Sequence, residues 1–170
     1  MRKCIGILFL LILSAMTTSY AAQSDDILGV WNNEEKDGKI EIYKCGGKYC
    51  GKIVWAKEPN YPAGSTEGTP GTPRLDNHNP DAAKRSRPIL GLQIVNDFIF
   101  AGDDVWKGGT VYDPKSGNTY RGKMMLVSPN ELDLRGFIGI PLFGRTTTWR
   151  RSMGEPLPHT PLFNSGPSAK

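Results

Sequence analysis

The sequence contains few of the residues that build metal sites and catalytic centres. It has three cysteines and two histidines in 170 residues, whereas a structural zinc site takes about four such ligands at close spacing. It also contains no Gly-x-Ser-x-Gly motif, which would mark a hydrolase nucleophile. We therefore expect no metal site, no cofactor and no catalytic residues. A hydrolase that uses Asp76 and His78 with a loop hydroxyl is the less favoured alternative.

Positive charge is in slight excess only, and long apolar runs are absent. The net charge of +4 falls to +2 when Arg2 and Lys3 are removed, and the basic residues are mostly scattered, which argues against a nucleic-acid partner. The longest apolar run, residues 5–16, is shorter than the roughly 20 residues of a membrane span. Preceded by basic residues and followed by small ones, this run predicts a signal peptide over residues 1–21.

The predicted signal peptide, which we call the leader, determines the expected compartment and the expected domain organisation. We expect a periplasmic or secreted protein without a transmembrane span. After the leader, the composition predicts one domain over residues 22–154 and a Pro-rich tail over residues 155–170.

Outside the leader only Cys45 and Cys50 remain, in the stretch KCGGKYCG. A thioredoxin-type redox motif has two residues between its cysteines, and this pair has four. In an oxidising compartment the pair predicts a structural disulfide, which would stabilise the fold by about 2 kcal/mol in the chain-entropy model. We expect it to brace a hairpin in which Cys45 lies directly opposite Cys50 and Ile42 lies opposite Ile53.

Apolar and polar residues alternate along most of the chain, and no helical stripe of three turns interrupts them. The pattern predicts eight strands, at 27–33, 39–45, 50–56, 90–100, 104–113, 118–127, 131–138 and 143–151. Short turns join most of these strands, which favours an all-β fold, an eight-stranded antiparallel up-and-down barrel. A sandwich of two sheets is the alternative. Gly108 and Gly109 inside a strand predict a bulge.

Residues 57–88 form a long connection with six prolines and no alternation. Within it, NPDAAK predicts a short helix with Asn79 as its N-cap. The polar residues of this loop are candidates for binding an anionic group: Asp76, Asn77, Asn79, Arg85 and Arg87. The alternative is that these residues form turns and caps within the loop itself.

Two motifs at opposite ends of the chain carry a first resemblance. Gly29-x-Trp31 opens the first strand, and TTTWRR closes the last. This pairing resembles the lipocalin and wider calycin barrels, in which the tryptophan lies across the barrel floor under an arginine from the end of the chain. The resemblance implies that Arg150 covers Trp31 in a cation–π contact, with Arg145 or Arg151 as alternatives.

A closer resemblance covers residues 28–151. The stretches CGGKYCGKIVW, DNHNPDAAKRSRPILGL, WKGGTVYDPKSGNTY and RGFIGIPLFGRTTTWRR are similar to a family of small exported bacterial proteins classed as a domain of unknown function. The resemblance implies a lipocalin-like fold and export, and it implies no established activity.

The barrel interior is a candidate site for a small ligand. Alternation and the floor motif place these side chains there: Trp31, Ile40, Ile42, Trp55, Phe98, Trp106, Tyr120, Met124 and Leu134. Gly122 and Gly136 are expected to leave space among them, and Trp106 and Tyr120 offer polar groups. A core filled by its own side chains is the alternative.

The uncharged run GFIGIPLFG, residues 136–144, is expected to fold over one barrel end as a plug. The alternative is an exposed apolar surface for a ligand, a membrane or a partner protein. Taken together, the sequence favours a non-enzymatic binding protein for a small apolar or amphipathic ligand. The alternative function is an envelope protein–protein interaction module with a filled core.

Overall fold

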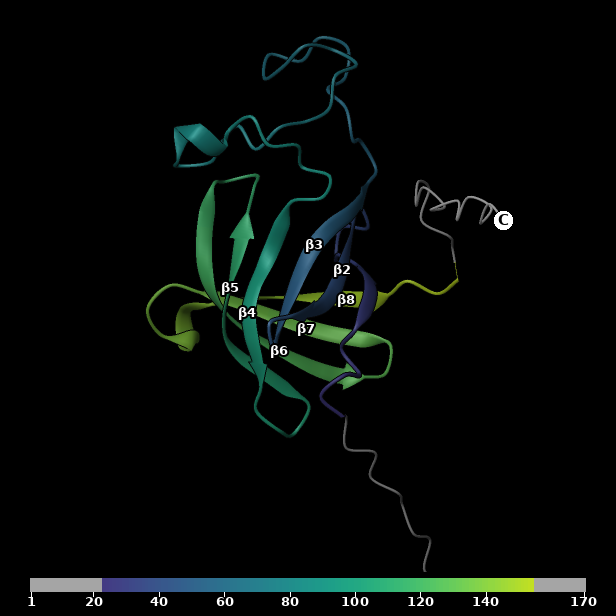
Figure 1. The fold of residues 1–170 in the computed structure, drawn as a ribbon, viewed down its shortest axis with the longest axis vertical. Coiled ribbons are helices and arrows are strands. Elements are labelled where there is room, and N and C mark those ends of the chain that lie inside the picture. Colours follow the sequence, from purple (N-terminus) through teal and green to yellow (C-terminus); the bar gives the residue numbers. More distant parts are fainter. Residues whose placement is uncertain (1–22, 155–170) are drawn as a thin grey trace, which may run out of the picture.

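Eight antiparallel strands close into a barrel in the computed structural model, which describes residues 23–154 (Figure 1). The strands are β1 (Gly29–Asn32), β2 (Gly38–Cys45), β3 (Lys48–Ala56), β4 (Gln93–Phe100), β5 (Val105–Asp113), β6 (Asn118–Ser128), β7 (Glu131–Phe137) and β8 (Arg145–Arg151). Each strand pairs with its neighbours in sequence, and β8 returns to β1. The predicted barrel is confirmed, and the sandwich alternative is wrong. The predicted signal peptide and Pro-rich tail lie outside the described residues.

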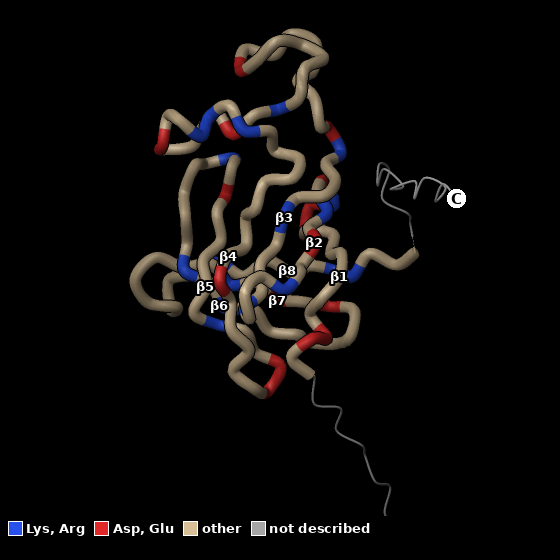
Figure 2. Tube along the Cα trace, in the orientation of Figure 1, with Lys and Arg blue, Asp and Glu red and all other residues tan. Residues whose placement is uncertain are grey.

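Alternation within each strand explains why the sheet closes around one core. In β6, Gly122, Met124 and Leu126 are buried while the residues between them are exposed. Met124 lies opposite Leu134 of β7, and Leu126 lies opposite Leu132, so apolar side chains of neighbouring strands pack on the inner face. Charged residues occur along the strands and on the loops (Figure 2).

The β2–β3 hairpin carries the predicted disulfide. Cys45 and Cys50 are bonded, and their Cα atoms are 5.9 Å apart. The turn between the strands contains two residues, Gly46 and Gly47, which both have positive φ, at 57° and 81°. A two-residue turn of this kind requires φ above zero at both positions, and glycine adopts such angles without steric cost.

This short turn corrects the expected hairpin register. We expected a four-residue turn with the cysteines directly opposite each other, and this expectation is wrong. The observed pairs are Cys45 with Lys48, Tyr43 with Cys50, Ile42 with Gly51 and Ile40 with Ile53. The disulfide therefore joins diagonal neighbours on one face of the sheet.

One end of the barrel, which we call the floor, is closed by residues 23–28. Trp31 Nε1 donates a hydrogen bond to the main-chain oxygen of Ile27 at 2.9 Å. Trp106 Nε1 donates to the main-chain oxygen of Ser24 at 3.3 Å. Two buried indoles thus find their polar partners in the segment that precedes the first strand.

The barrel is joined by a short seam between its first and last strands. β1 pairs with β8 at Trp31–Arg151 and Asn32–Arg150, whereas β8 pairs with β7 from Arg150 as far as Arg145. Part of β8 therefore has a paired neighbour on one side and an opening toward the β1–β2 turn on the other.

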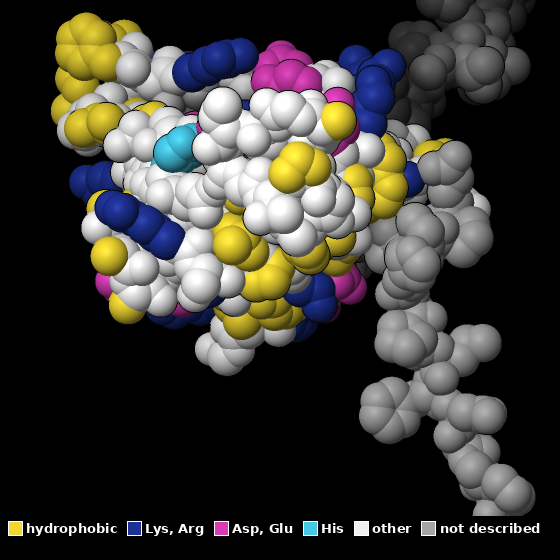
Figure 3. Space-filling view, turned by 90° about the horizontal axis from the view of Figure 1, so that it is seen from above, with side chains coloured by type: hydrophobic (Ala, Val, Ile, Leu, Met, Phe, Trp, Pro, Cys, Tyr) yellow, Lys and Arg dark blue, Asp and Glu magenta, His cyan; other side chains and the backbone are white. Residues whose placement is uncertain are grey.

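The connection between β3 and β4 projects from the end opposite the floor, which we call the mouth (Figure 1). This connection lies toward the viewer in Figure 3, which looks at the mouth from above. The predicted short helix is not confirmed, because the chain forms a single 3-10 turn there, η1 (Ala82–Lys84). Asp81, not Asn79, caps this turn by accepting the amide of Ala83. None of the helical turns between residues 23 and 154 is long and apolar enough to cross a membrane.

Candidate functional site

The tryptophan at the barrel floor is covered by Arg151, and the expected role of Arg150 is corrected. The guanidinium carbon of Arg151 lies 4.2 Å from the centroid of the Trp31 ring, within the range of a cation–π contact. Three main-chain oxygens accept hydrogen bonds from Arg151 at 2.8, 2.6 and 2.7 Å, those of Leu28, Asp26 and Pro129. Burial lowers the pKa of Arg151 below its usual value, and the nearby Asp26 carboxylate opposes this effect.

The strand register explains why Arg151 and not Arg150 performs this role. Adjacent residues of a strand point to opposite faces, and Arg151 lies opposite Trp31. Arg150 points outward, where it forms an ion pair with Glu131 at 2.9 Å. Gly29 allows the close approach: its φ is +118°, and a Cβ there would lie 3.1 Å from Arg151 Nη1.

Most of the predicted interior residues pack against one another and form the core. Trp31, Ile40, Ile42, Phe98, Trp106, Met124 and Leu134 belong to one buried apolar cluster. The space expected at Gly122 is occupied, because a Cβ there would lie 2.3 Å from Phe98 Cζ. A Cβ at Gly109 would lie 2.2 Å from Cδ2 of the same ring. At the level of Phe98 the barrel is filled by its own side chains.

Trp55 and Tyr120 lie outside this core. A register shift in the β2–β3 pairing places Trp55 opposite Lys39, and Lys39 Nζ lies 5.4 Å from the centroid of a Trp55 ring. Lys39 is only 7% exposed, and Trp55 is partly buried and does not belong to the core cluster. Tyr120 is partly buried on the inner face near the mouth, beside Gly136.

The polar residues of the β3–β4 loop bond mainly to each other. Asp76 is fully buried, and its carboxylate accepts hydrogen bonds from Tyr112, Asn79 and Arg87. The remaining contacts are Arg85 Nε to the main-chain oxygen of Asn79 at 2.7 Å, and Asn77 Nδ2 to Tyr61 Oη and to the main-chain oxygen of Glu67. These contacts favour a structural role for the loop, and anion binding by it stays a prediction.

Tyr112 on β5 anchors this loop to the barrel wall. Burial and, next, the hydrogen bond to the Asp76 carboxylate together raise the pKa of Tyr112 to about 12. The phenol is therefore the donor in this bond at neutral pH. His78, on the same loop, lies 3.9 Å from Glu67. No group of three or more His, Cys, Asp or Glu within residues 23–154 is arranged to hold a metal ion.

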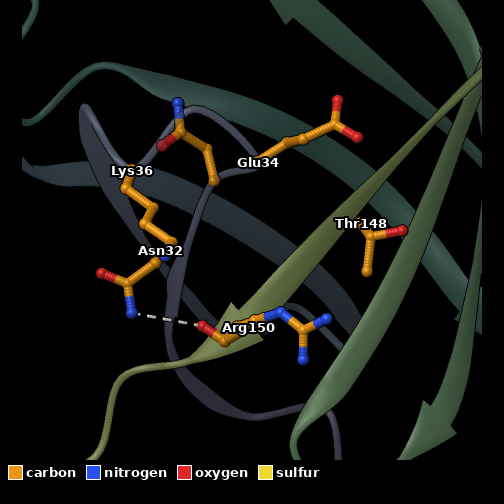
Figure 4. A pocket seen from close by; sticks show the side chains of 6 residues that line it. Asn32, Glu34, Lys36, Thr148 and Arg150 are labelled. Carbon is orange, nitrogen blue, oxygen red and sulfur yellow. Dashed lines mark hydrogen bonds between the residues drawn. The ribbon is translucent and has the colours of Figure 1, made fainter.

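A polar pocket lies beside the seam, where β1 and β8 diverge (Figure 4). Its volume is about 390 Å³, and its lining residues are Asn32, Asn33, Glu34, Lys36, Thr148 and Arg150. Asn33 shapes the β1–β2 turn, because its side-chain oxygen accepts the amides of Asp37 and Gly38 at 3.0 Å each. Asn32 Nδ2 donates to the main-chain oxygen of Arg150 across the seam at 3.3 Å, the dashed line in Figure 4.

Sequence reasoning missed this pocket, apart from naming Arg150 for another role. The expected first strand extended to residue 33, so no opening was expected beside the last strand. The signal lies in strand length: a first strand of four residues cannot cover a last strand of seven. The polar run NNEEKDG after Trp31 marks where the first strand ends.

The uncharged run at 136–144 does not plug the barrel, and that expectation is wrong. After β7 the chain forms a loop that contains the 3-10 turn η2 (Pro141–Phe143). Its large side chains Ile138, Ile140, Leu142 and Phe143 are 72, 54, 75 and 80% exposed. Arg135 holds the loop on the outside of the barrel by donating to the main-chain oxygens of Pro141 and Leu142. The exposure that the alternative requires is confirmed, and its role in binding a ligand, a membrane or a partner protein stays a prediction.

Comparisons with known proteins agree with this fold. Residues 29–151 match the sequence model of a family described as "Uncharacterized protein conserved in bacteria (DUF2147)". The structure is similar to that of protein HP1028 from the human pathogen Helicobacter pylori, described as belonging to the lipocalin family. The TM-score is 0.60 at 22% identity, over 74% of this chain and 82% of that chain. At this identity the likeness shows the fold alone. No curated protein matches the chain.

Proposed function

This chain belongs to the bacterial protein family DUF2147, and we propose that it is an exported, non-enzymatic protein that binds a small amphipathic molecule. The disulfide between Cys45 and Cys50 supports export, because such bonds persist in oxidising compartments. The lipocalin-like barrel supports ligand binding only at the level of the fold.

The observation that carries the proposal is the pocket at the seam. A volume of about 390 Å³ is at the lower end of the range of small-molecule sites, roughly 300–1,000 Å³. The filled core at Phe98 makes a deep central cavity a poor candidate. The opening beside β8 therefore replaces the barrel centre as the proposed site.

The lining of the pocket indicates the polar part of the ligand. Lys36 offers positive charge, Asn32 and Asn33 offer amides, and Thr148 offers a hydroxyl. Arg150 adds a guanidinium that is also paired with Glu131 at 2.9 Å. Arg145 lies 3.6 Å from Glu34 across the opening, so the one acidic group of the lining faces a cation. This balance favours a ligand with an anionic or strongly polar head.

The apolar part of the ligand is proposed to enter the opening between β8 and the β1–β2 turn. On the inner face behind this opening, Thr147 and Tyr120 are partly buried. Tyr120 thereby keeps its proposed role as a ligand contact near the mouth, beside the space left at Gly136, whereas the core side chains only fill the barrel. The alternative of a protein–protein module with a filled core is not favoured by the pocket.

Native mass spectrometry of the protein purified from its own cell envelope tests this proposal. We expect a bound small molecule, and we expect reference amphiphiles such as a fatty acid to raise the melting temperature. Thr148→Trp, which fills the pocket, and Lys36→Glu, which reverses its charge, should both lower occupancy by about tenfold.

Lys84→Glu is the matched control, because Lys84 is an exposed lysine on the β3–β4 loop. It should leave occupancy unchanged. If the folded wild-type protein carries no small molecule and no amphiphile shifts its melting temperature, the proposal is wrong. It is equally wrong if the pocket variants bind as well as the wild type.

A further inference from the structure

The outer face of β5, β6 and β7 carries a row of positive charge. Lys107 of β5 lies opposite Lys123 of β6, and Lys123 lies opposite Arg135 of β7. Arg121 is two residues before Lys123 and therefore lies on the same face. We call Lys107, Arg121, Lys123 and Arg135 the basic row. Like charges directly opposite each other destabilise a sheet. The basic row therefore lowers the stability of the barrel when nothing is bound to it.

Acidic side chains do not neutralise the basic row. Within residues 23–154, Lys107, Arg121 and Lys123 form no ion pair. Arg135 donates to uncharged oxygens, those of Pro141, Leu142 and Thr146. Asp133, the acidic residue two positions before Arg135 on β7, accepts a hydrogen bond from Thr148 instead. The row is therefore a local excess of positive charge.

An exposed apolar loop adjoins the basic row. Residues 138–143, which we call the apolar hook, leave β7 directly after Phe137, and Phe137 lies opposite Arg121. Arg135 Nε and Nη2 donate to the main-chain oxygens of Pro141 and Leu142 at 2.8 and 3.2 Å. One member of the row thus holds the main chain of the hook and leaves its apolar side chains exposed.

The figures show the two features beside each other. The loop between β7 and β8 projects from the side of the barrel in Figure 1. Lys and Arg residues lie on the neighbouring strands in Figure 2. Seen from above, apolar side chains gather at the corresponding edge of the molecule (Figure 3).

The combination matches the chemistry of an anionic membrane surface. Contiguous exposed apolar side chains mark interaction sites. A segment that presents large apolar residues next to lysines and arginines binds at the membrane interface, because the apolar groups enter the acyl region while the cations attract lipid phosphates. A protein partner would need a cavity that fits a projecting hook, whereas a bilayer needs only the charge that the basic row complements.

We propose that the apolar hook and the basic row dock this protein on a bilayer of anionic phospholipids. In the docked state the side chains of Leu142 and Phe143 lie among the acyl chains. Lys107, Arg121 and Lys123 lie against the phosphates. This docking is independent of ligand binding at the seam, which lies between β8 and the β1–β2 turn.

Flotation of the full chain with lipid vesicles tests the proposal. Vesicles of phosphatidylethanolamine with phosphatidylglycerol should carry the protein, and vesicles of phosphatidylcholine alone should carry at least about tenfold less. Raising the salt from about 50 to about 500 mM should release much of the bound protein, because salt screens the contact between the basic row and the phosphates.

Two double variants separate the two parts of the surface. Leu142→Ser with Phe143→Ser removes apolar side chains, and Lys107→Glu with Lys123→Glu reverses the charge. Each should lower binding by about tenfold or more. The control pairs Leu90→Ser with Lys84→Glu, an exposed apolar residue and an exposed lysine on the β3–β4 loop, and should leave binding within about twofold.

Circular dichroism and thermal unfolding establish that each variant is folded before it is compared. No flotation of the wild type with anionic vesicles would overturn the proposal. So would equal binding to neutral vesicles, or equal binding by the double variants. Capture of an acidic protein through the same residues, without vesicle binding, would assign the surface to a protein partner and would also overturn it.

Discussion

Arg150 and Arg151 form an informative pair at the scale of single residues, because neighbouring positions in β8 give them opposite surroundings. Arg151 lies over Trp31 and donates to three main-chain oxygens. Arg150 is exposed and paired with Glu131. The sequence identified both arginines as candidates for the floor contact, but the choice depends on which face each occupies, and only the strand register decides that.

Replacing Arg151 should cost far more stability than replacing Arg150. Arg151→Ala removes the cation–π contact and the donor to three carbonyls, two of them partly buried, so the free energy of unfolding should fall by about 2–4 kcal/mol. Arg150→Ala breaks an exposed ion pair and should cost less than about 1 kcal/mol. Urea unfolding of both variants measures the difference. Equal losses in the free energy of unfolding would contradict a stabilising contact between Arg151 and Trp31.

Tyr112 makes the stability of the protein depend on pH in the alkaline range. Its pKa is raised from 10.0 to about 12, so the folded protein holds the phenolic proton more tightly than the unfolded chain does. The stabilisation is fully present below about pH 10 and is lost as the pH rises through about 12.

Urea midpoints at about pH 9 and about pH 11.5 measure this effect. The wild type should lose more stability over this interval than Tyr112→Phe, which has no phenolic proton to release. A Tyr112→Phe midpoint that falls as steeply as that of the wild type would contradict the assignment. Lysines and other tyrosines titrate in both proteins, so the comparison removes their contribution.

At the scale of strands and turns, the packing of the Phe98 ring against Gly109 and Gly122 shows how the barrel interior is filled. The chain reaches Phe98 through Asp97, which has a positive φ of 61°. The predicted bulge at Gly108 and Gly109 is confirmed by a register shift between Lys107 and Thr110. The sequence indicated small residues on the inner face, but the ring that occupies the space comes from another strand, so alternation alone could not reveal it.

Gly122→Ala should destabilise the protein while Gly136→Ala should not. The two glycines lie opposite each other on β6 and β7. A Cβ at 122 would lie 2.3 Å from Phe98 Cζ, whereas a Cβ at 136 would meet nothing nearer than Tyr120 Cβ at 3.5 Å. We expect a loss of about 1–3 kcal/mol for the first variant and a change of less than about 1 kcal/mol for the second.

A double-variant cycle attributes this loss to the ring of Phe98. In a Phe98→Leu background, Gly122→Ala should cost less, because the smaller side chain gives room for the new methyl group. Chemical denaturation of the four proteins supplies the coupling energy. A coupling energy of zero between Gly122→Ala and Phe98→Leu would contradict the contact between residue 122 and the Phe98 ring.

The β2–β3 hairpin shows both the reach and the limit of sequence reasoning. Residue types and compartment predicted the disulfide, which is present. The assumption that bonded cysteines must lie directly opposite led to the wrong register, although the Gly46-Gly47 pair is itself a signal for a two-residue turn. Local turn chemistry was the stronger constraint, because diagonal neighbours are also close enough to bond.

At the scale of the whole molecule, alternation predicted all eight strands and their sequential pairing, because each strand needs only its own residues to show its two faces. The loop network around Asp76 and the pocket at the seam could not be predicted in the same way. They depend on which segments meet when the barrel closes, and this information is spread over the entire chain.

The seam should be visible in amide hydrogen exchange. In antiparallel strands, successive residues direct their amides to opposite neighbours. The amide of Arg151 bonds toward Asn130 and that of Ser152 toward Val30, so the amides of Thr146 and Thr148 face the opening beside β1.

These two amides should exchange faster than those of Thr147 and Trp149, which face β7. Exchange followed residue by residue by NMR measures the contrast. Uniform protection from Thr146 to Trp149 would mean that the opening is closed in solution. The internal comparison within one strand removes differences in global stability.

The contacts of Arg151 also determine when the barrel can close during folding. They join it to Leu28 and Asp26, 123 and 125 residues earlier in the chain. Contacts of such long range form late, since the ends of a long loop must be brought together first. A nascent chain therefore cannot close the barrel before Arg151 has been synthesised, when most of the sequence has already left the ribosome.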